Sequence, residues 1–187
     1  MDQELYFIAL IPPEELREQI QQLKLEVADK FKSSHSLNAP PHITLVSPFR
    51  INEDQVSGLQ SILLLPILEV YTQGNQPFQV CLKGFATFPP RVIFIDVNKS
   101  DELQQFQKKL EEMIRAEDAF GYNYHERPYH PHITLAFKDL SKENFYKAWD
   151  EFKDCDMEEA FMADHVYLLK HNGEIWEVFS EYSLSNG

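Results

Sequence analysis

The sequence predicts an α+β fold of two lobes, each with a small, mainly antiparallel sheet flanked by helices. Apolar runs of strand length alternate with longer amphipathic segments, and two of the runs flank an Asn172-Gly173 dipeptide that is typical of a hairpin turn. A purely parallel sheet would need a crossover between every pair of strands, so the hairpin favours largely antiparallel sheets. The string Pro-His-Ile-Thr-Leu occurs at 41–45 and again at 131–135, which indicates a duplicated fold with a pseudo-two-fold axis and a central cleft.

The first half of the chain has the pattern strand, helix, strand, helix. A compact apolar run opens it and ends at Pro12-Pro13. Pro13 and the two glutamates that follow are typical of a helix N-terminus, because proline fits the first turn and acids face the positive end of the helix dipole. The predicted elements are a strand at 5–11, a helix at 13–31, a strand at 42–49 and a helix from 54 to about 65.

The second half contains more strands than the first. Pro89-Pro90 marks a turn between two apolar runs, and Ser100 and Ser141 each stand where a helix N-cap is expected. Residues 33–41 and 118–128 are predicted loops. The predicted elements are strands at 78–85 and 92–97, a helix at 101–117, a strand at 132–137, a helix after Ser141, and strands at 163–169 and 175–184.

Length and charge limit what the protein can be. A chain of 187 residues with 43% hydrophobic content is predicted to form one domain, residues 1–187, of two lobes with one copy of the repeated string in each. Its formal net charge of −13 opposes binding to a long nucleic-acid tract, because such binding depends on many Lys and Arg contacts to phosphates. We therefore expect the partner to be a small nucleotide or an RNA end.

The cysteines and the N-terminus indicate the compartment. Cys81 and Cys155 are isolated in sequence and are predicted to be reduced thiols. The N-terminus lacks the basic and apolar regions of a signal peptide, and no apolar run approaches the ~20 residues that a membrane span needs. The prediction is a cytoplasmic protein with no membrane contact and no cofactor, for which a monomer is favoured.

The two copies of the repeated string lie 90 residues apart. Solenoid repeats are shorter, about 20–50 residues, so this spacing favours the duplication of a half-domain. Each copy follows a loop that contains proline and precedes a predicted helix. Two related halves would place the copies opposite each other across the cleft.

Strand geometry divides each string into two faces. Residues i and i+2 of a strand point to the same side, so His42 shares a face with Thr44, and His132 shares a face with Thr134. The isoleucine and leucine of each string point the other way and can anchor the strand in the core. The proline before each histidine cannot donate to a sheet, which suits the start of a strand.

Two imidazoles and two hydroxyls around one cleft suit phosphodiester chemistry. A neutral histidine can take a proton from water or a ribose hydroxyl, while a protonated one gives a proton to the departing oxygen. The threonine hydroxyls can donate to the non-bridging oxygens and hold the phosphorus in line between the imidazoles. This arrangement requires no metal, because an imidazolium and hydrogen bonds neutralise the charge.

The tetrads His42–Leu45 and His132–Leu135 make the chain similar to the two-histidine (2H) phosphoesterase superfamily. Within it, the chain resembles the LigT-like 2′-5′ RNA ligases and 2′,3′-cyclic phosphodiesterases, which carry one His-x-Thr/Ser-hydrophobic tetrad in each half. The resemblance covers about residues 4–184. LigT proper often has an arginine near its second tetrad, whereas this chain continues 136–138 as Ala-Phe-Lys, which is similar to a bacterial branch of the family.

The resemblance implies a fold, a reaction and roles for four residues. The fold would be bilobal and α+β, and the reaction would be metal-independent hydrolysis or reversible ligation at 2′-linked phosphates. His42 and His132 would carry the proton transfers. Thr44 and Thr134 would bind the phosphate.

Further residues are candidates for substrate contact. Arg91 follows the Pro-Pro turn and could reach the phosphate, and Arg127 could support binding. Tyr129 and Phe88 could stack on a base. Each also has an ordinary explanation, as a surface charge for the arginines and as core packing for the aromatic residues.

Two other classes of function are compatible with the same residues. A non-catalytic module could bind nucleotides or RNA ends in the same pocket, although binding alone does not need two proton-transfer groups. A metal hydrolase could use the His-x-His pair His130 and His132. His130, however, has no counterpart near the first tetrad, where Pro40 stands.

Overall fold

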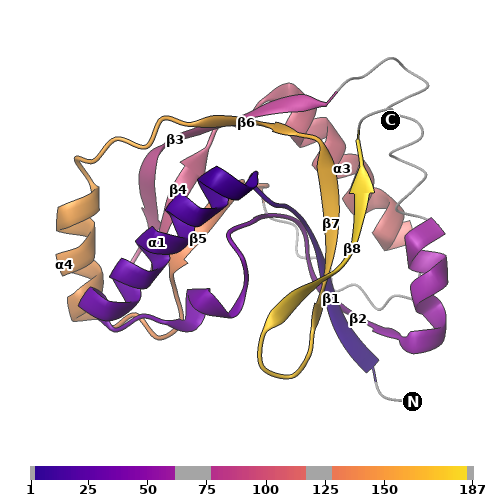
Figure 1. Cartoon of the computed structure of the whole chain (residues 1–187), viewed down its shortest axis with the longest axis horizontal. Helices are drawn as coiled ribbons and strands as arrows, with labels where there is room; N and C mark the ends of the chain where they lie inside the picture. The colour runs from indigo at the N-terminus through magenta and orange to yellow at the C-terminus, as the bar shows by residue number, and fades with distance from the viewer. Residues whose placement is uncertain (1–2, 62–76, 117–127, 185–187) are drawn as a thin grey trace.

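The computed structural model, which describes residues 3–61, 77–116 and 128–184, contains two four-stranded antiparallel sheets (Figure 1). The first has the order β2-β1-β7-β8 and consists of β1 (Gln3–Leu10), β2 (Ile43–Asn52), β7 (His165–His171) and β8 (Trp176–Ser183). The second has the order β5-β4-β3-β6 and consists of β3 (Phe78–Phe88), β4 (Val92–Val97), β5 (His132–Ala136) and β6 (Ala160–Ala163). The predicted α+β class with two antiparallel sheets is confirmed.

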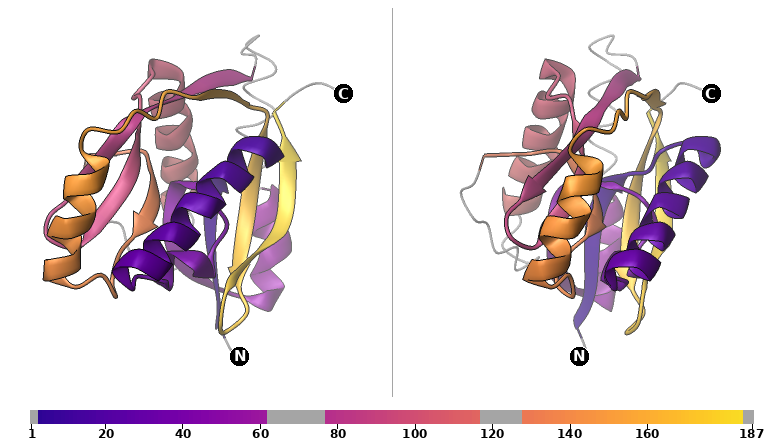
Figure 2. Two further views of the ribbon diagram at one scale, coloured as in Figure 1. Left: turned by 60° about the vertical axis from the view of Figure 1, so that its left-hand side comes forward. Right: turned by 90° about the vertical axis from the view of Figure 1, so that its left-hand side faces the viewer.

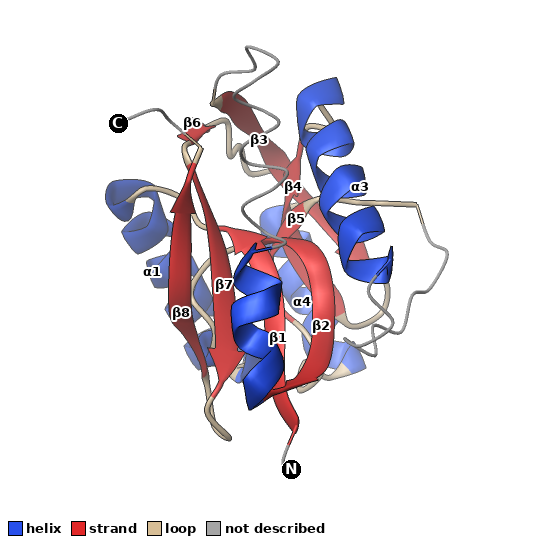
Figure 3. Cartoon of the chain, turned by 90° about the vertical axis from the view of Figure 1, so that its right-hand side faces the viewer, coloured by secondary structure: helices blue, strands red, loops and turns tan. Residues whose placement is uncertain are grey.

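Helices cover the sheets from two sides. Figures 1 and 3 show α1 and α4 on one side of the sheets and α3 on the other. As predicted, Ser141 Oγ accepts a hydrogen bond from the amide of Asn144, and Ser100 Oγ accepts one from the amide of Leu103. The helical segments are α1 (Glu14–Phe31), η1 (His35–Asn38), η2 (Glu53–Gln55) with helical residues 56–61 after it, α3 (Asp101–Ala116) and α4 (Lys142–Phe152).

Several predicted boundaries fall outside the described residues. They are the end of the helix predicted at 54–65, residue 117 at the end of the next one, and most of the loop at 118–128. Within the described ranges, no helix combines the length and the apolar character that crossing a bilayer would require.

The two halves repeat one order of elements. In the first half, β1 is followed by α1 and then by β2, which pairs antiparallel with β1. In the second half, β4 is followed by α3 and then by β5, which pairs antiparallel with β4. Each repeated string therefore lies at the start of an edge strand, β2 in the first sheet and β5 in the second. This correspondence supports the duplication that the sequence predicts.

The halves also exchange strands. β3 follows the first half in sequence but belongs to the second sheet, whereas β7 and β8 follow the second half but belong to the first sheet. The chain crosses from one sheet to the other between β6 and β7 (Figures 1 and 2). This exchange supports the proposal of a single domain of two lobes.

The strand predicted at 163–169 is present as β7, which begins two residues later, but the short strand β6 before it was not predicted, and the two strands join different sheets. β6 ends at Ala163 and pairs with β3, while β7 begins at His165 and pairs with β1. Asp164 separates them, and its carbonyl accepts a hydrogen bond from the amide of Leu184. Apolar residues continue on both sides of this aspartate, so local periodicity could not show that the partner strand changes.

The hairpin predicted around Asn172-Gly173 is present. Asn172 Oδ1 accepts hydrogen bonds from the amides of Glu174 and Ile175, both at 3.0 Å, and Gly173 has a φ of 107° that side chains disfavour. β7 and β8 run antiparallel from this turn.

One apolar core joins the two sheets. It includes the isoleucine and leucine of both repeated strings, Ile43, Leu45, Ile133 and Leu135, which are all buried. The anchoring face predicted for each string is therefore confirmed. A second cluster lies where α1 contacts α4, with Val27, Phe31, Phe145 and Ala148 among its members.

Candidate active site

The two histidines of the repeated strings have matching surroundings. His42 lies directly before β2, and His132 is the first residue of β5. Each ring is half-buried, and each Nδ1 lies 2.7 Å from the carbonyl oxygen two residues earlier, that of Pro40 or that of His130. A carbonyl oxygen can only accept, so Nδ1 carries the hydrogen and Nε2 of the neutral ring keeps a lone pair. In both halves, Nε2 is therefore the atom available for proton transfer.

A phenylalanine from the neighbouring strand packs against each imidazole. The ring centroids of Phe7 and His42 lie 4.8 Å apart, and those of Phe94 and His132 also lie 4.8 Å apart. Phe7 belongs to β1 and Phe94 to β4, which are equivalent strands of the two halves. The carbonyl and the aromatic ring together fix the orientation of each imidazole.

Burial lowers the pKa of both imidazoles. It lowers the pKa of His42 to about 4, against the opposing effect of the Pro40 carbonyl, and the positive charges of Lys24 and His132 lower it further. Burial also lowers the pKa of His132, and the positive charge of His130 lowers it further, against the opposing effects of the His130 carbonyl and the Asp96 carboxylate. Without a bound anion, both rings are neutral at neutral pH.

One pocket gathers residues of both strings. Its volume is about 250 Å³, and His42, Thr44 and Thr134 all line it. His132 shares a strand face with Thr134 and lies close enough to His42 for its charge to lower that pKa. The structure thus brings the four predicted residues to one place from opposite halves of the chain.

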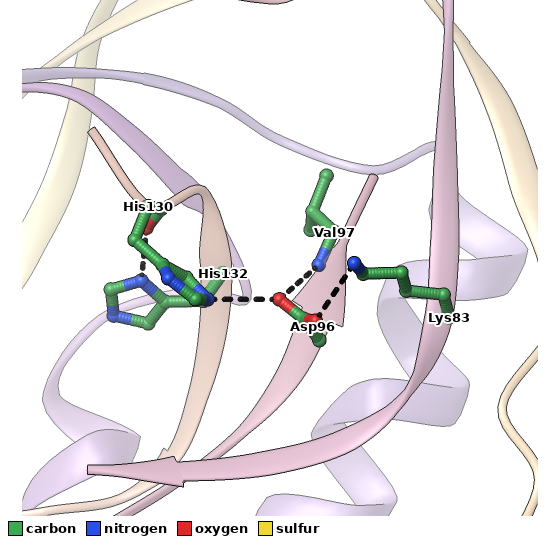
Figure 4. A network of polar contacts seen from close by, with 5 residues as sticks. All are labelled: Lys83, Asp96, Val97, His130 and His132. Atoms are coloured by element: carbon green, nitrogen blue, oxygen red, sulfur yellow. Dashed lines mark hydrogen bonds and ion pairs between the residues drawn. The ribbon is translucent and has the colours of Figure 1, made fainter. Parts of the chain in front are cut away.

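A polar network lies behind the second histidine (Figure 4). His130 Nε2 is 3.0 Å from Asp96 Oδ1, and Lys83 Nζ is 3.2 Å from Asp96 Oδ2. The carbonyl of His130 in turn accepts from His132 Nδ1. Pro40 takes the equivalent place in the first half and has no side chain that could make such a network.

The same network engages ring nitrogens of His130 and His132, the pair that the metal-hydrolase alternative would use as ligands. The His130 ring is engaged by Asp96, and His132 Nδ1 is engaged by a carbonyl. Among residues 3–61, 77–116 and 128–184, no three His, Cys, Asp or Glu side chains gather in a way that could hold a metal ion.

The loop after α1 forms part of the pocket wall, and the segment after β5 holds it in place. Asp139 accepts hydrogen bonds from Ser33 Oγ (2.7 Å) and from the amides of Ser34 (2.8 Å) and His35 (2.9 Å). Ser36 Oγ donates to the carbonyl of Leu135 at 2.7 Å. These contacts tie the first half of the chain to the second beside the pocket.

Asp139→Ala is expected to lower the free energy of unfolding by about 1–2 kcal/mol, because the donors of Ser33, Ser34 and His35 lose their carboxylate at a partly solvated site. Partial burial raises the pKa of Asp139, but these hydrogen bonds outweigh it and hold the pKa below its ordinary 3.8. The stabilisation is therefore present above pH 3.8 and is lost as the pH falls through the lower, folded-state pKa. Urea unfolding at several pH values measures it, with the exposed Asp154→Ala as control. Equal midpoints for native and Asp139→Ala protein at neutral pH would contradict the assignment.

Two of the predicted substrate contacts lie away from the pocket wall. The hydroxyl of Tyr129 donates to the carbonyl of Thr44 at 3.2 Å, and its ring packs against the core, so it supports the first motif strand. Burial raises the pKa of that hydroxyl, which stays protonated. Arg91 is exposed after the Pro89-Pro90 turn. Substrate contact by either residue stays a prediction.

The other two candidates have different outcomes. Phe88 is 39% exposed, and its ring centroid lies 5.3 Å from that of His132, so stacking of a base on it stays a prediction that this position favours. Arg127 lies outside the described residues.

Several pocket residues were not predicted from the sequence. Lys24, His35, Lys138 and Trp176 all line the pocket. The sequence could have indicated Lys24, because it stands four residues after Ile20 on the apolar stripe of α1. Trp176 had none, since only the return of β8 to the first sheet brings it to Phe7, with ring centroids 4.6 Å apart.

Known proteins share this sequence and fold. A sequence model of the 2′-5′ RNA ligase superfamily matches residues 12–174. A Bacillus licheniformis protein with the curated name "putative phosphoesterase" is 26% identical over 186 residues, covering 96% of this chain and 98% of that protein. A Staphylococcus haemolyticus protein of similar name is 25% identical over 182 residues, covering 95% of this chain and 98% of that protein.

The fold is similar to that of a solved structure. E. coli LigT, crystallised with 3′-AMP, matches with a TM-score of 0.67 at 18% identity, covering 99% of this chain and 100% of that one. LigT has also been crystallised with phosphate, with ATP and with NADP+. At this identity, the likeness to LigT establishes the fold.

Proposed function

Because this chain belongs to the 2′-5′ RNA ligase superfamily, we propose that it is a phosphodiesterase for 2′,3′-cyclic phosphates or 2′-5′ linkages, in nucleotides or at RNA ends. One observation carries the proposal. His42, Thr44 and Thr134 line one pocket, and His132, on the strand face of Thr134, lies close enough to His42 for its charge to lower the pKa of His42; each imidazole has Nδ1 engaged by a carbonyl. The proposed reaction needs no metal, and with a 5′-hydroxyl in place of water the same site would carry out reversible 2′-5′ ligation from a 2′,3′-cyclic phosphate.

In the proposed hydrolysis, His42 is the base and His132 is the acid. Nε2 of His42 takes a proton from water as the water oxygen bonds to phosphorus. Nε2–H of His132 gives a proton to the ribose oxygen as its bond to phosphorus breaks. The assignment follows from the surrounding charges, since Lys24 and His132 both disfavour the charged form of His42, whereas at His132 the Asp96 carboxylate opposes the effect of His130. In ligation, the 5′-hydroxyl of a second RNA end replaces the water, gives its proton to His42 and bonds to phosphorus as the ribose 3′-oxygen leaves with the proton of His132. The two histidines exchange roles in the reverse of that step, in which the 3′-hydroxyl attacks the 2′-5′ linkage and the 5′-oxygen leaves.

A bound phosphodiester prepares both groups for these roles. Its negative charge favours the protonated form of a nearby imidazole, so it raises both pKa values toward neutrality. The hydroxyls of Thr44 and Thr134 donate to its non-bridging oxygens and keep the phosphorus in line.

A small ligand fits the proposal best. The net charge of −13 disfavours a long RNA, and the ligands crystallised with LigT are phosphate and nucleotides. We therefore propose cyclic nucleotides, 2′-5′-linked dinucleotides and RNA ends as substrates.

The test is a substrate panel with EDTA present. It contains 2′,3′-cyclic nucleotides and 2′-5′-linked dinucleotides, with 3′-5′-linked dinucleotides as the negative set and the His42→Ala/His132→Ala double variant as the control protein. Turnover of at least one 2′-linked ester by the native chain alone is expected. Turnover of none, or equal turnover by the double variant, contradicts the proposal.

A non-catalytic module that binds nucleotides in the same pocket is the second candidate. The observation in its favour is the pKa of about 4 for His42, since so weak a base transfers protons slowly. A bound anion raises that pKa, which keeps catalysis the favoured reading. Tight binding of a cyclic nucleotide without any turnover in the panel would establish the module instead.

The pH profile of kcat/KM is expected to be bell-shaped with its maximum below pH 6.5. Activity is lost as the pH falls through the pKa of His42, about 4, because the base becomes protonated. It is also lost as the pH rises through the pKa of His132, which lies below the ordinary 6.5, because the acid loses its proton. The profile of kcat lies at higher pH, since bound phosphodiester raises both values.

Asp96→Asn provides the matched control for that profile. Asp96 raises the pKa of His132, so its neutralisation moves the alkaline limb to lower pH and leaves the acid limb in place. Initial rates measured from about pH 4 to 9 check both limbs. A kcat/KM that continues to rise above neutrality contradicts the assignment of His132 as the acid.

A further inference from the structure

A lysine occupies a core position of α1. The buried residues of this helix are Leu16, Ile20, Lys24, Val27 and Phe31, spaced three or four apart as on one helix face. Four of them are apolar, yet Lys24 is only 1% exposed. A lysine is almost never fully buried unless it is paired, so its position calls for a partner.

Among the described residues, Lys24 has one hydrogen-bond acceptor but no carboxylate to neutralise its charge. Lys24 Nζ donates to the carbonyl of Ala39 at 2.6 Å. An ammonium group carries three donors, and within the described part of the chain no carboxylate forms an ion pair with Lys24. Burial lowers its pKa to about 8, so the group remains largely charged at neutral pH. A buried charge without a counter-ion is costly.

The pocket is where a counter-ion would lie. Lys24 lines it together with His42, Thr44 and Thr134. The positive charge of Lys24 lowers the pKa of His42, so the ammonium is close to that imidazole. In a chain with a net charge of −13, a buried cation beside two hydroxyls and an imidazole forms a local anion site.

We propose that the ammonium of Lys24 binds a non-bridging oxygen of the scissile phosphate, as a third anchor beside the hydroxyls of Thr44 and Thr134. The inference rests on the proposed phosphodiester chemistry of this pocket and adds a residue that neither repeated string contains. Negative charge spreads over the non-bridging oxygens during phosphoryl transfer, and a fixed ammonium in a partly desolvated pocket stabilises it. The phosphate in turn supplies the counter-ion that the core does not.

Lys24→Met tests the proposal with inorganic phosphate as the probe. Methionine keeps the length of the side chain and suits the apolar stripe of α1. Phosphate should bind at least about tenfold more weakly to this variant, as expected for a lost hydrogen bond to a charged group. The melting temperature should stay equal or rise, because an uncompensated buried charge is removed. Lys30→Met, on the same helix but exposed and paired with Glu151, should bind phosphate like the native chain.

The combination of the two readouts distinguishes binding from a structural role. A lysine that served only to hold the carbonyl of Ala39 would cost stability when replaced and would leave phosphate affinity within twofold of native, and that affinity result overturns the proposal. The kcat/KM of Lys24→Met for a 2′,3′-cyclic nucleotide should fall by a factor similar to that for phosphate affinity.

A measurement on the native chain does not depend on how the variant folds. Lysine side chains labelled with 13C report their titration by NMR, and the midpoint of Lys24 is expected near pH 8, because burial lowers its pKa to about 8. Saturating phosphate should move that midpoint upward, because a bound anion favours the charged ammonium. An unchanged midpoint overturns the proposal.

Both measurements follow binding, so they separate this inference from the proposed function. A chain that binds phosphate through Lys24 but cleaves no ester keeps this inference and loses the proposed function. A chain that cleaves cyclic phosphates equally well with and without Lys24 loses this inference alone.

Discussion

His42→Ala and His132→Ala should each reduce kcat by about 10²–10⁴-fold, because each removes one proton-transfer group. The loss should be the same with EDTA present, since the proposed reaction uses no metal. Initial rates on the best substrate of the panel measure the effect. If both variants kept native activity on every 2′-linked ester, the proposed chemistry would be wrong.

The fold should survive both substitutions. Each imidazole is half-buried, and the hydrogen bond that it makes within the described residues goes to a carbonyl two residues away. The apolar residues that anchor each strand, Ile43 and Ile133 among them, remain in place. Circular dichroism spectra and melting temperatures check this. His165→Ala provides a matched control, because His165 also stands at the start of a strand but does not line the pocket, and it should keep full activity.

The double variant tests whether the histidines act together. Groups that serve one concerted proton transfer are strongly non-additive, so removing both should cost little more than removing one. Two independent contributions would instead multiply. A product of the two single effects would show that the imidazoles do not share one reaction step.

The repeated string could be interpreted from sequence alone because its physics is local. Strand periodicity places Thr44 on the face of His42 and sends Ile43 into the core, and the structure has Ile43 buried and Thr44 on the pocket. The same holds for Thr134 and Ile133. Short-range geometry is enough here, since a strand alternates its faces whatever lies beyond it.

The strand order could not be predicted, because it depends on contacts between residues far apart in sequence. Nothing near Asp164 shows that the chain changes sheets there, and nothing near Trp176 shows that it returns to Phe7. These pairings are set by which apolar faces fit together in the shared core. Local periodicity does not contain that information.

In the pocket too, contacts between residues close in sequence could be predicted, and contacts between residues far apart could not. The tautomer of His132 is set by the carbonyl of His130, two residues away, which a sequence can suggest. The link from His130 to Asp96 spans 34 residues and depends on the pairing of β4 with β5. Lys24 could be predicted in part. The sequence shows that it stands on the apolar stripe of α1, but it does not show that the ammonium lies close to His42.

The threonine pair is expected to give the second large effect. Thr44→Val and Thr134→Val each remove one hydroxyl and keep the shape of the side chain. A hydrogen bond to a charged group is worth about 1.5–3 kcal/mol, or about 10- to 150-fold. Because each hydroxyl is proposed to hold a different oxygen of one phosphate, the double variant should lose at least about 100-fold in kcat/KM.

The double valine variant should be as stable as the native chain. Within the described residues, neither hydroxyl makes a hydrogen bond to another part of the protein, so no internal partner is left unsatisfied. Valine also suits a strand at least as well as threonine. The melting temperature, together with the NMR titration of His42 and His132, verifies that the imidazoles keep their surroundings.

Serine separates the hydroxyl from the rest of the threonine side chain. Thr44→Ser/Thr134→Ser keeps both donors and loses only the methyl groups, so most of the activity lost in the valine variant should return. Activity that stays low with serine would assign the effect to packing around the pocket. Full activity in the valine variant would show that the histidines work on a phosphate held by other groups, and Lys24 would then be the first of these to test.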